Sequence, residues 1–247
     1  MKTTVIVTCK DRKKNVEFCM ASIAKAEPRP EVILVDFGSV ESLVYLEDRY
    51  ENVRVIRVDH ATDMFHKSRA INIGVKAATT EYICITDADQ IFAKNFFGSV
   101  ESSISKNHKG FVVCYTEILT KLPEYATWDN VDVIYDKLLE LAKKGTVKAY
   151  GDGCCNGLRR AAFMKMHGYD EGYIGYRSED SDFWLRAETR GMSVINIYDQ
   201  TSMVHLPHPK NGAYYAHHFQ NVNYNRYVRS KKNGNVVANI GKKWGEL

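Results

Sequence analysis

The sequence predicts an α/β fold: a mostly parallel central sheet flanked by helices, within a single domain. Short β-branched apolar runs alternate with segments of helical periodicity over residues 1–90, the pattern of chains that build parallel sheets. The length of 247 residues suits one such domain. With 45% hydrophobic and 26% charged residues, the composition excludes collagen-like, coiled-coil and disordered chains.

The expected elements follow one another along the chain. Strands are predicted over 3–8 (TTVIVT), 31–36 (EVILVD), 53–58 and 81–86 (EYICIT), with helices over 15–25 and 67–78. Further strands are expected over 111–116, 154–158 and 193–197, and further helices over 131–143 and 179–190. Because parallel sheets bind ligands at the carboxyl ends of their strands, we expect the functional loops there.

Two features of the sequence bear on the compartment of the protein. No apolar run approaches the roughly 20 residues that a membrane helix needs, and the apolar stretch at residues 1–8 is too short for a signal peptide. The six cysteines are spread through apolar segments and form no CxxC pair. We therefore expect no transmembrane segment, buried thiols rather than disulfides, and a cytoplasmic protein.

The formal net charge of +4 is concentrated in residues 210–247, which hold seven Lys and Arg against one acid. Such a segment is either a solvated end or the contact for an anionic partner: a sugar-nucleotide diphosphate, an acidic polymer, nucleic acid or a membrane surface. A helix that closes the domain is favoured over nucleic-acid binding. Proteins that bind single strands mix aromatic and cationic groups in the same way; the residues concerned are Tyr214, Tyr215, His217, His218, Tyr224, Arg226, Tyr227 and Arg229.

Two carboxylates directly follow the predicted strand 81–86. Asp87-Ala88-Asp89 places them two residues apart on a turn, where both can reach one divalent cation or one cation and a ribose. Hard oxygen ligands of this kind suit Mg²⁺ or Mn²⁺ bridging a diphosphate. Their place at the carboxyl end of a buried strand favours this interpretation over a solvated turn.

An acidic run, Ser178-Glu179-Asp180-Ser181-Asp182, precedes the apolar residues of the helix predicted over 179–190. Ser178 is expected to cap that helix, and acids in a first turn favour its dipole. Three acids in four positions exceed what capping needs. A carboxylate placed there can act as a general base toward a hydroxyl group.

Other polar residues stand where a metal or a nucleotide would lie. His205 and His208 are three residues apart in an extended, proline-limited segment, and a neutral imidazole could complete a metal site begun by Asp89. Arg12 follows the first strand and can pair with phosphate, while Asp36 follows the second and can accept from a base or ribose. Neither a GxGxxG fingerprint nor a P-loop is present, so metal and side chains must hold the phosphates.

Several segments resemble glycosyltransferases of the GT-A fold and the family-2 type. The resemblance begins in the ordered series VIVTCKDR, ILVDFGS and FHKSRAINIGVKAATTEYICITDADQ. The later stretch GDGCCNGLRRAAFMKMHGYDEGYIGYRSEDSDFWLRAETRG is similar to a signature shared by β-1,4-galactosyltransferases, polypeptide N-acetylgalactosaminyltransferases and chondroitin polymerases. It is the more specific of the two, and together they span residues 5–209.

The resemblance implies a role for particular residues. For the nucleotide-sugar donor, the matching positions are Thr8, Lys10, Arg12, Asp36, Arg69, Asn72, Asp87 and Ala88. For the metal, expected to be Mn²⁺ or Mg²⁺, they are Asp87, Asp89, His205 and His208. Glu179 and Asp180 match the acids that bind the acceptor, and Asp180 stands where inverting members keep the catalytic base. Tyr176-Arg177-Ser178 replaces the Trp-Gly-Gly of galactosyltransferases, and Phe37 replaces the second acid of the usual VDDGS.

The implied activity is metal-dependent transfer of a sugar, of the galactose or N-acetylgalactosamine type, from a UDP-sugar to a hydroxyl acceptor. Inversion is favoured, although the polypeptide branch contains retaining enzymes. We expect a donor-binding half over 1–95, an acceptor-binding half over 96–209, and a basic segment over 210–247 packed on both. Two alternatives stay open: a nucleotidyltransferase acting on a sugar phosphate, and a degenerate transferase fold that binds an anionic polymer or nucleic acid.

Overall fold

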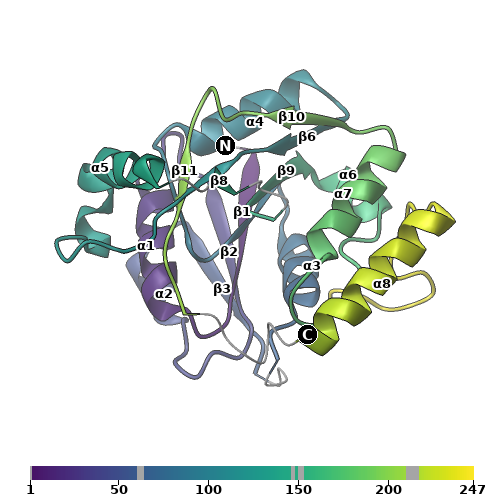
Figure 1. Ribbon diagram of the computed structural model, residues 1–247. Coiled ribbons are helices and arrows are strands. Elements are labelled where there is room, and N and C mark those ends of the chain that lie inside the picture. Colours follow the sequence, from purple (N-terminus) through teal and green to yellow (C-terminus); the bar gives the residue numbers. More distant parts are fainter. Residues whose placement is uncertain (1, 60–63, 146–147, 150–152, 210–216) are drawn as a thin grey trace.

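A seven-stranded sheet runs through the centre of the molecule (Figure 1). The computed structural model describes residues 2–59, 64–145, 148–149, 153–209 and 217–247. In spatial order the strands are β10 (Ser193–Asn196), β6 (Gly110–Val113), β9 (Cys155–Arg159), β4 (Tyr82–Asp87), β1 (Thr3–Cys9), β2 (Glu31–Asp36) and β3 (Val53–Arg57). Neighbouring strands are parallel except where β9 pairs with β4 and β6. The predicted mostly parallel α/β sheet is therefore confirmed.

Helices cover both faces of this sheet. The helices in the described part of the chain are α1 (Lys13–Ala24), α2 (Tyr45–Arg49), α3 (Lys67–Ala77), α4 (Phe96–Lys106), α5 (Val131–Lys144), α6 (Arg160–Lys165), α7 (Glu179–Thr189) and α8 (His217–Asn233), with the 3-10 turn η1 (Trp128–Asn130) before α5. Of these, α5 packs on α1 and α8 on α7 rather than on this sheet. Successive side chains of a strand point to opposite faces. Accordingly, Val5 and Val7 of β1 pack in one apolar cluster with α1 and α4, whereas Ile6 packs in another with α3, α6 and α7.

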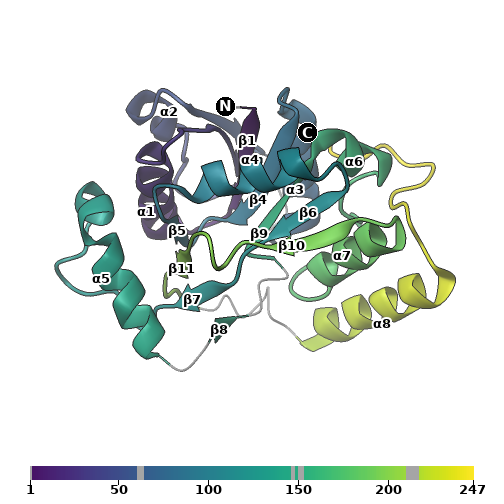
Figure 2. The same cartoon turned by 90° about the horizontal axis from the view of Figure 1, so that it is seen from above.

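A second, four-stranded sheet was not expected from the sequence. Its order is β5 (Gln90–Phe92), β11 (Met203–His205), β7 (Thr116–Ile118) and β8 (Lys148–Ala149). In Figure 2 these strands lie together beside the central sheet, with α5 on their outer side. The prediction of one strand over 111–116 is wrong, because the chain leaves the central sheet after β6 and enters the second sheet at β7. This sheet brings β11, and with it His205, next to β5.

The C-terminal segment packs on the domain rather than leaving it. Helix α8 contacts α7 (Figure 1), and residues 235–247 return to α3 and α6. There the buried Trp244 joins the apolar cluster of Phe163, and Asn239 donates hydrogen bonds to the carbonyls of His167 and Tyr169. The helical part of this segment was predicted; Tyr214 and Tyr215, which belong to the aromatic and cationic series, lie outside the described residues.

Two further expectations can be compared with the described residues. All six cysteines are free, and five of them are buried. None of the described helices combines the length and apolar character needed to cross a membrane.

Candidate active site

A cavity of about 730 Å³ opens at the carboxyl ends of β1 and β4 and reaches the start of α7. The topology brings loops from distant parts of the sequence to this edge, as expected of a mostly parallel sheet. Most of the residues singled out in the sequence line the cavity: Thr8, Lys10, Arg12, Asp87, Ala88, Asp89, Glu179, Asp180, His205 and His208. Asp36, Arg69 and Asn72 do not line it.

Asp89, His205 and His208 form a cluster in which one potential ligand atom from each lies within 4.8 Å of the others. Asp89 Oδ2 is 3.2 Å from His208 Nε2, and Asp89 Oδ1 is 3.6 Å from His205 Nε2. Both Asp89 Oδ1 and His205 Nδ1 are buried and have no hydrogen-bond partner among the described residues. A set of oxygen and imidazole ligands with spare lone pairs fits a divalent cation such as Mn²⁺.

The charges of this cluster depend on one another. A hydrogen bond to Asp89 raises the pKa of His208 above its usual value. Burial alone would raise the pKa of Asp89, but His208 and His205 more than offset it, so that this pKa is lowered. Without a metal, Asp89 thus favours a proton on His208, and Arg12 adds positive charge beside the same carboxylate. A cation that uses this imidazole must displace that proton.

The other carboxylate of the DxD sequence takes part in a different contact. Asp87 Oδ1 lies 2.9 Å from Lys67 Nζ, and the same ammonium lies 3.1 Å from Asp180 Oδ2. Burial, together with the charges of Asp89 and Asp180, raises the pKa of Asp87, against the lowering effect of Lys67. Lys67 thus joins the metal side of the cavity to the acceptor side.

Lys67 was not singled out in the sequence, although it is the first residue of α3 and its side chain is only 9% exposed. Charged residues in the first turn of a helix usually face water, so its pattern offered no signal. The facing carboxylates of Asp87 and Asp180 account for its burial, because a buried charge needs partners. These two acids come from segments that meet only in the folded chain.

The entry to α7 is conformationally strained. Arg177 and Ser178 have φ angles of 97° and 74°, which non-glycine residues rarely adopt. Ser178 occupies the N-cap position as predicted, but its side chain makes no capping hydrogen bond. That part of the prediction is wrong, because a capping side chain needs an extended backbone to reach back to the first turn. This backbone turn leads directly into Glu179 and Asp180, which line the cavity.

Asp180 is held on two sides. Its Oδ1 accepts a hydrogen bond of 2.9 Å from the Tyr169 hydroxyl, and its Oδ2 accepts one of 3.1 Å from Lys67. Gly153 approaches closely: a Cβ atom at that position would lie 2.2 Å from Asp180 Oδ2. Any larger residue at 153 would therefore displace the carboxylate.

Glu179 has a different environment from its neighbour. It is only 5% exposed, and its Oε2 has no hydrogen-bond partner within the part of the chain that the structure describes. Burial, with the charge of Asp180 beside it, raises the pKa of Glu179 to about 8. At neutral pH the side chain is therefore mainly protonated and can donate a hydrogen bond.

The raised pKa of Glu179 predicts a pH dependence of stability. Between its ordinary pKa of 4.5 and about 8 the folded protein holds a proton that the unfolded chain has lost. The free energy of unfolding should fall as the pH rises through this window, by at most about 1.4 kcal/mol per pH unit, and level off above it. Glu179→Gln should flatten the profile in urea unfolding from pH 5 to 9. Parallel profiles for wild type and Glu179→Gln would contradict this expectation; Glu188→Gln, at an exposed position on the same helix, is the control.

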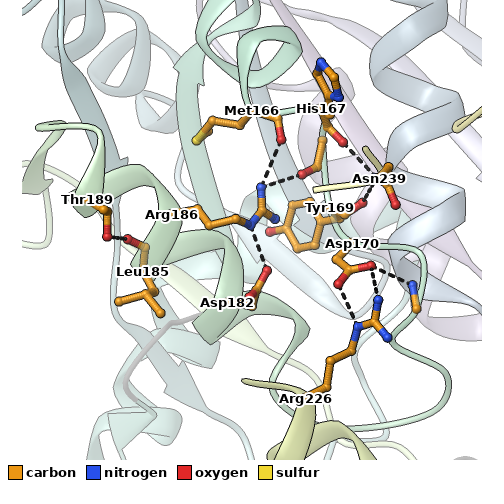
Figure 3. A network of polar contacts seen from close by, with 12 residues as sticks. Met166, His167, Tyr169, Asp170, Asp182, Leu185, Arg186, Thr189, Arg226 and Asn239 are labelled. Carbon is orange, nitrogen blue, oxygen red and sulfur yellow. Dashed lines mark hydrogen bonds and ion pairs between the residues drawn. The ribbon is translucent and has the colours of Figure 1, made fainter. Parts of the chain in front are cut away.

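A polar network fastens α7 to the loop that precedes it (Figure 3). The buried Arg186 donates to Asp182 Oδ2 at 2.8 Å and to the carbonyls of Met166 and Gly168 at 3.2 and 2.9 Å. Arg226 of α8 binds both carboxylate oxygens of Asp170, at 2.7 and 2.8 Å. Residues 166–170 are thereby fixed between α7 and α8.

The three predicted residues outside the cavity hold loops around it. Asp36 is fully buried, accepts from the backbone amides of Ser39 and Leu43, and pairs with Arg57 at 2.6 Å. The remaining two, Asn72 and Arg69, bond to the backbone of Tyr169 and to the carbonyl of Glu246, respectively. Their expected contacts with a nucleotide stay predictions.

The fold and the polar cavity at the carboxyl ends of its strands indicate an enzyme. Comparisons with known proteins show the family to which the chain belongs. A match to the family described as glycosyl transferase family 2 covers residues 4–166, so the chain belongs to that family. Residues 145–209 match a second family, described as the N-terminal domain of galactosyltransferase. The predicted family resemblance is thus confirmed. No curated protein sequence matches the chain.

Solved structures with a similar fold include TarS of S. aureus. Residues 1–349 of TarS in complex with UDP align with a TM-score of 0.63 at 18% identity, covering 85% of this chain and 61% of that one. GalNAc-T7 with UDP, GalNAc and Mn²⁺ aligns with a TM-score of 0.67 at 15% identity, covering 92% of this chain and 48% of that one. The chain thus spans less than two thirds of the length of these proteins, and the similarity shows that they share the GT-A fold.

Proposed function

We propose that the protein transfers a sugar from a UDP-sugar to a hydroxyl acceptor with the help of Mn²⁺ or Mg²⁺. The observation that carries this proposal is that one cavity holds both the Asp89, His205 and His208 cluster and Asp180. Lys67 pairs with Asp180 on one side and, on the other, with Asp87, two residues before Asp89. The ligands in GalNAc-T7, which are UDP, GalNAc and Mn²⁺, support a donor of this class. The match to a galactosyltransferase domain supports a sugar of the galactose or N-acetylgalactosamine type.

In this proposal Asp89, His205 and His208 hold the cation, and Asp87 lies beside them. The bound cation supplies Lewis-acid stabilisation of the negative charge that develops on the leaving diphosphate. Arg12 and Lys10 line the same end of the cavity and add positive charge near the phosphates. Residues 1–95 thereby provide the donor half and residues 96–209 most of the acceptor half, with α8 packed on α7.

Asp180 acts as the general base. Its Oδ2 takes the proton of the acceptor hydroxyl while that oxygen forms a bond to C1 of the sugar. The bond between C1 and the diphosphate oxygen breaks, and UDP leaves with the electron pair, so that the configuration at C1 is inverted. Glu179, protonated at neutral pH, is placed to donate a hydrogen bond to the acceptor. Lys67 lies between Asp87 and Asp180 and offsets part of the repulsion between their two carboxylates.

A screen of donors tests this function. The protein would be incubated with Mn²⁺ and each of several UDP-sugars, including UDP-galactose, UDP-GalNAc and UDP-GlcNAc, and UDP release and thermal stabilisation recorded. Release of UDP from one donor, abolished by EDTA, is the expected result. Release of pyrophosphate from UTP and a sugar phosphate would instead indicate a nucleotidyltransferase. No response to any donor would contradict the proposed function, and binding to single-stranded nucleic acid that weakens steeply with salt would then favour a binding module.

The affinity for Mn²⁺ is expected to rise with pH. Because Asp89 raises the pKa of His208, a proton competes with the metal for this imidazole at and below neutral pH. The dissociation constant for Mn²⁺ should fall about tenfold per pH unit while His208 is mainly protonated, and change little once it is neutral. Isothermal titration calorimetry in two buffers with different enthalpies of ionisation would measure the affinity and the proton released. An affinity independent of pH between 5.5 and 8 would contradict a role for His208 as a ligand.

A further inference from the structure

A chain of hydrogen bonds inside the protein ends on Asp180. The indole Nε1 of Trp184 donates to Asn156 Oδ1 at 3.0 Å. Asn156 Nδ2 donates to the Tyr169 hydroxyl at 2.8 Å, and this hydroxyl donates to Asp180 Oδ1 at 2.9 Å. Asn156 lies on β9, Tyr169 in the loop after α6, and Trp184 and Asp180 on α7. Asn156 and Tyr169 are fully buried.

The chemistry of the groups fixes the direction of this chain. An indole N–H can only donate, so the amide of Asn156 must turn its oxygen toward Trp184 and its NH₂ toward Tyr169. The hydroxyl of Tyr169 accepts that bond and has a single proton of its own. That proton is directed to Asp180, whose carboxylate can only accept when ionised. The indole N–H of Trp184 at one end of the chain therefore determines that Asp180, at the other end, accepts a hydrogen bond from the Tyr169 hydroxyl.

The phenol of Tyr169 is itself firmly placed. Its ring stacks on Phe183 with centroids 4.3 Å apart and planes inclined by 10°. The side-chain amide of Asn72 bonds both to the backbone N–H and to the backbone carbonyl of Tyr169. The hydroxyl therefore presents its proton from a fixed point, and a carboxylate that receives a bond from a fixed donor loses its freedom to rotate.

We propose that Tyr169 is a positioning residue, which holds Oδ1 of Asp180 so that Oδ2 faces Lys67 and the acceptor. This inference rests on the proposed function, in which Oδ2 takes the proton of the acceptor. In that geometry the carboxylate oxygen that receives the proton is set before substrate arrives. Asn156 and Trp184 act on Asp180 through Tyr169. Asn156 is one hydrogen bond further from the reaction than Tyr169, and Trp184 is two.

The test compares two tyrosine-to-phenylalanine variants. Tyr169→Phe removes the hydroxyl that bonds Asp180 and leaves the stacked ring. Tyr173→Phe is the matched control, because Tyr173 is buried in the same loop and its hydroxyl forms no hydrogen bond with any described residue. We expect Tyr169→Phe to lower kcat about 10–100-fold, as a misdirected catalytic group does. KM for the UDP-sugar and the Kd for UDP should stay within about twofold of wild type, and Tyr173→Phe should leave kcat unchanged.

A double variant separates positioning from a general loss of structure. In an Asp180→Asn background, Tyr169→Phe should lower the residual rate by less than about twofold. The reason is that the Tyr169 hydroxyl and the Asp180 carboxylate contribute to the same step, the removal of the acceptor proton. An undiminished effect in that background, or a wild-type kcat for Tyr169→Phe, would overturn the inference. If Asp180→Asn itself leaves transfer intact, the proposed base has failed instead.

Crystal structures of the two phenylalanine variants give a readout that does not require activity. The carboxylate of Asp180 should turn away from its position or occupy more than one orientation in Tyr169→Phe, and keep its position in Tyr173→Phe. If no donor releases UDP, the proposed function fails and this comparison alone decides the positioning role. An Asp180 that keeps the same single orientation in both variants would overturn it.

Discussion

Asp180→Asn is expected to lower the rate of sugar transfer about 10²–10⁴-fold while the affinity for the UDP-sugar stays nearly unchanged. The amide has almost the shape of the carboxylate but cannot take the proton of the acceptor hydroxyl. The donor is expected to be bound by the cation cluster and the loop after β1, neither of which includes Asp180. Measurements of kcat by UDP release and of donor affinity by calorimetry would give the two quantities separately.

Two controls sharpen the measurement. Glu188→Gln makes the same kind of charge change near the other end of α7, on an exposed side chain, and should leave kcat unchanged. Proton NMR of the first product formed by wild type should show inversion at the anomeric carbon. An equal loss of transfer and donor binding in Asp180→Asn would argue against the base, as would a product with retained configuration.

The central sheet could be predicted because its signals are local. The apolar runs of β1, β2 and β4 are unbroken, and polar residues follow each of them. Because the three strands are parallel, these polar residues lie at the same edge of the sheet. Asp87 and Asp89 stand at the end of a strand, and Asp180 in the first turn of a helix, so local pattern alone predicts that these acids lie at the cavity. Residues whose position depends on the strand or helix just before or after them are thus the predictable part of the site.

The second sheet could not be predicted in the same way. Its strands β5, β7 and β11 have only three residues each, which is too short for an alternating pattern to be recognised. Its stability comes from pairing between segments far apart in the sequence, such as β5 with β11. The histidines could be named from their spacing, but their approach to Asp89 depends on this pairing.

Lys67 and Tyr169 escaped prediction for a related reason. Each looks ordinary in its own segment, a lysine that begins a helix and a tyrosine in a polar loop, and each acquires its partners through the tertiary fold. Asp36 shows the converse: its place after a strand suggested a ligand contact, yet its carboxylate closes the loop between β2 and α2. A sequence pattern gives the position of a polar group more readily than its partner.

Arg186→Met is expected to lower the free energy of unfolding by about 3–5 kcal/mol. The guanidinium is 1% exposed and neutralises the equally buried Asp182, so its removal leaves an uncompensated carboxylate and takes a hydrogen bond from the carbonyls of Met166 and Gly168. The Met166 carbonyl keeps the bond that it accepts from the backbone N–H of Ala238. Urea unfolding measures the change. Exposed Arg190→Met, at the end of the same helix, should change it by less than about 0.5 kcal/mol.

A second substitution distinguishes a buried charge from lost packing. In Arg186→Met with Asp182→Leu no charge remains, and a buried ion pair replaced by apolar groups is often nearly neutral, so the double variant should recover much of the stability. A double variant as unstable as Arg186→Met would show that the bonds to the carbonyls of Met166 and Gly168 matter more than charge. If the double variant recovers its stability as expected, its kcat should still lie below that of wild type, because those carbonyls precede Tyr169 in the same loop. Stability would in that case depend on the charge of Arg186, and catalysis on its hold over the loop that carries Tyr169.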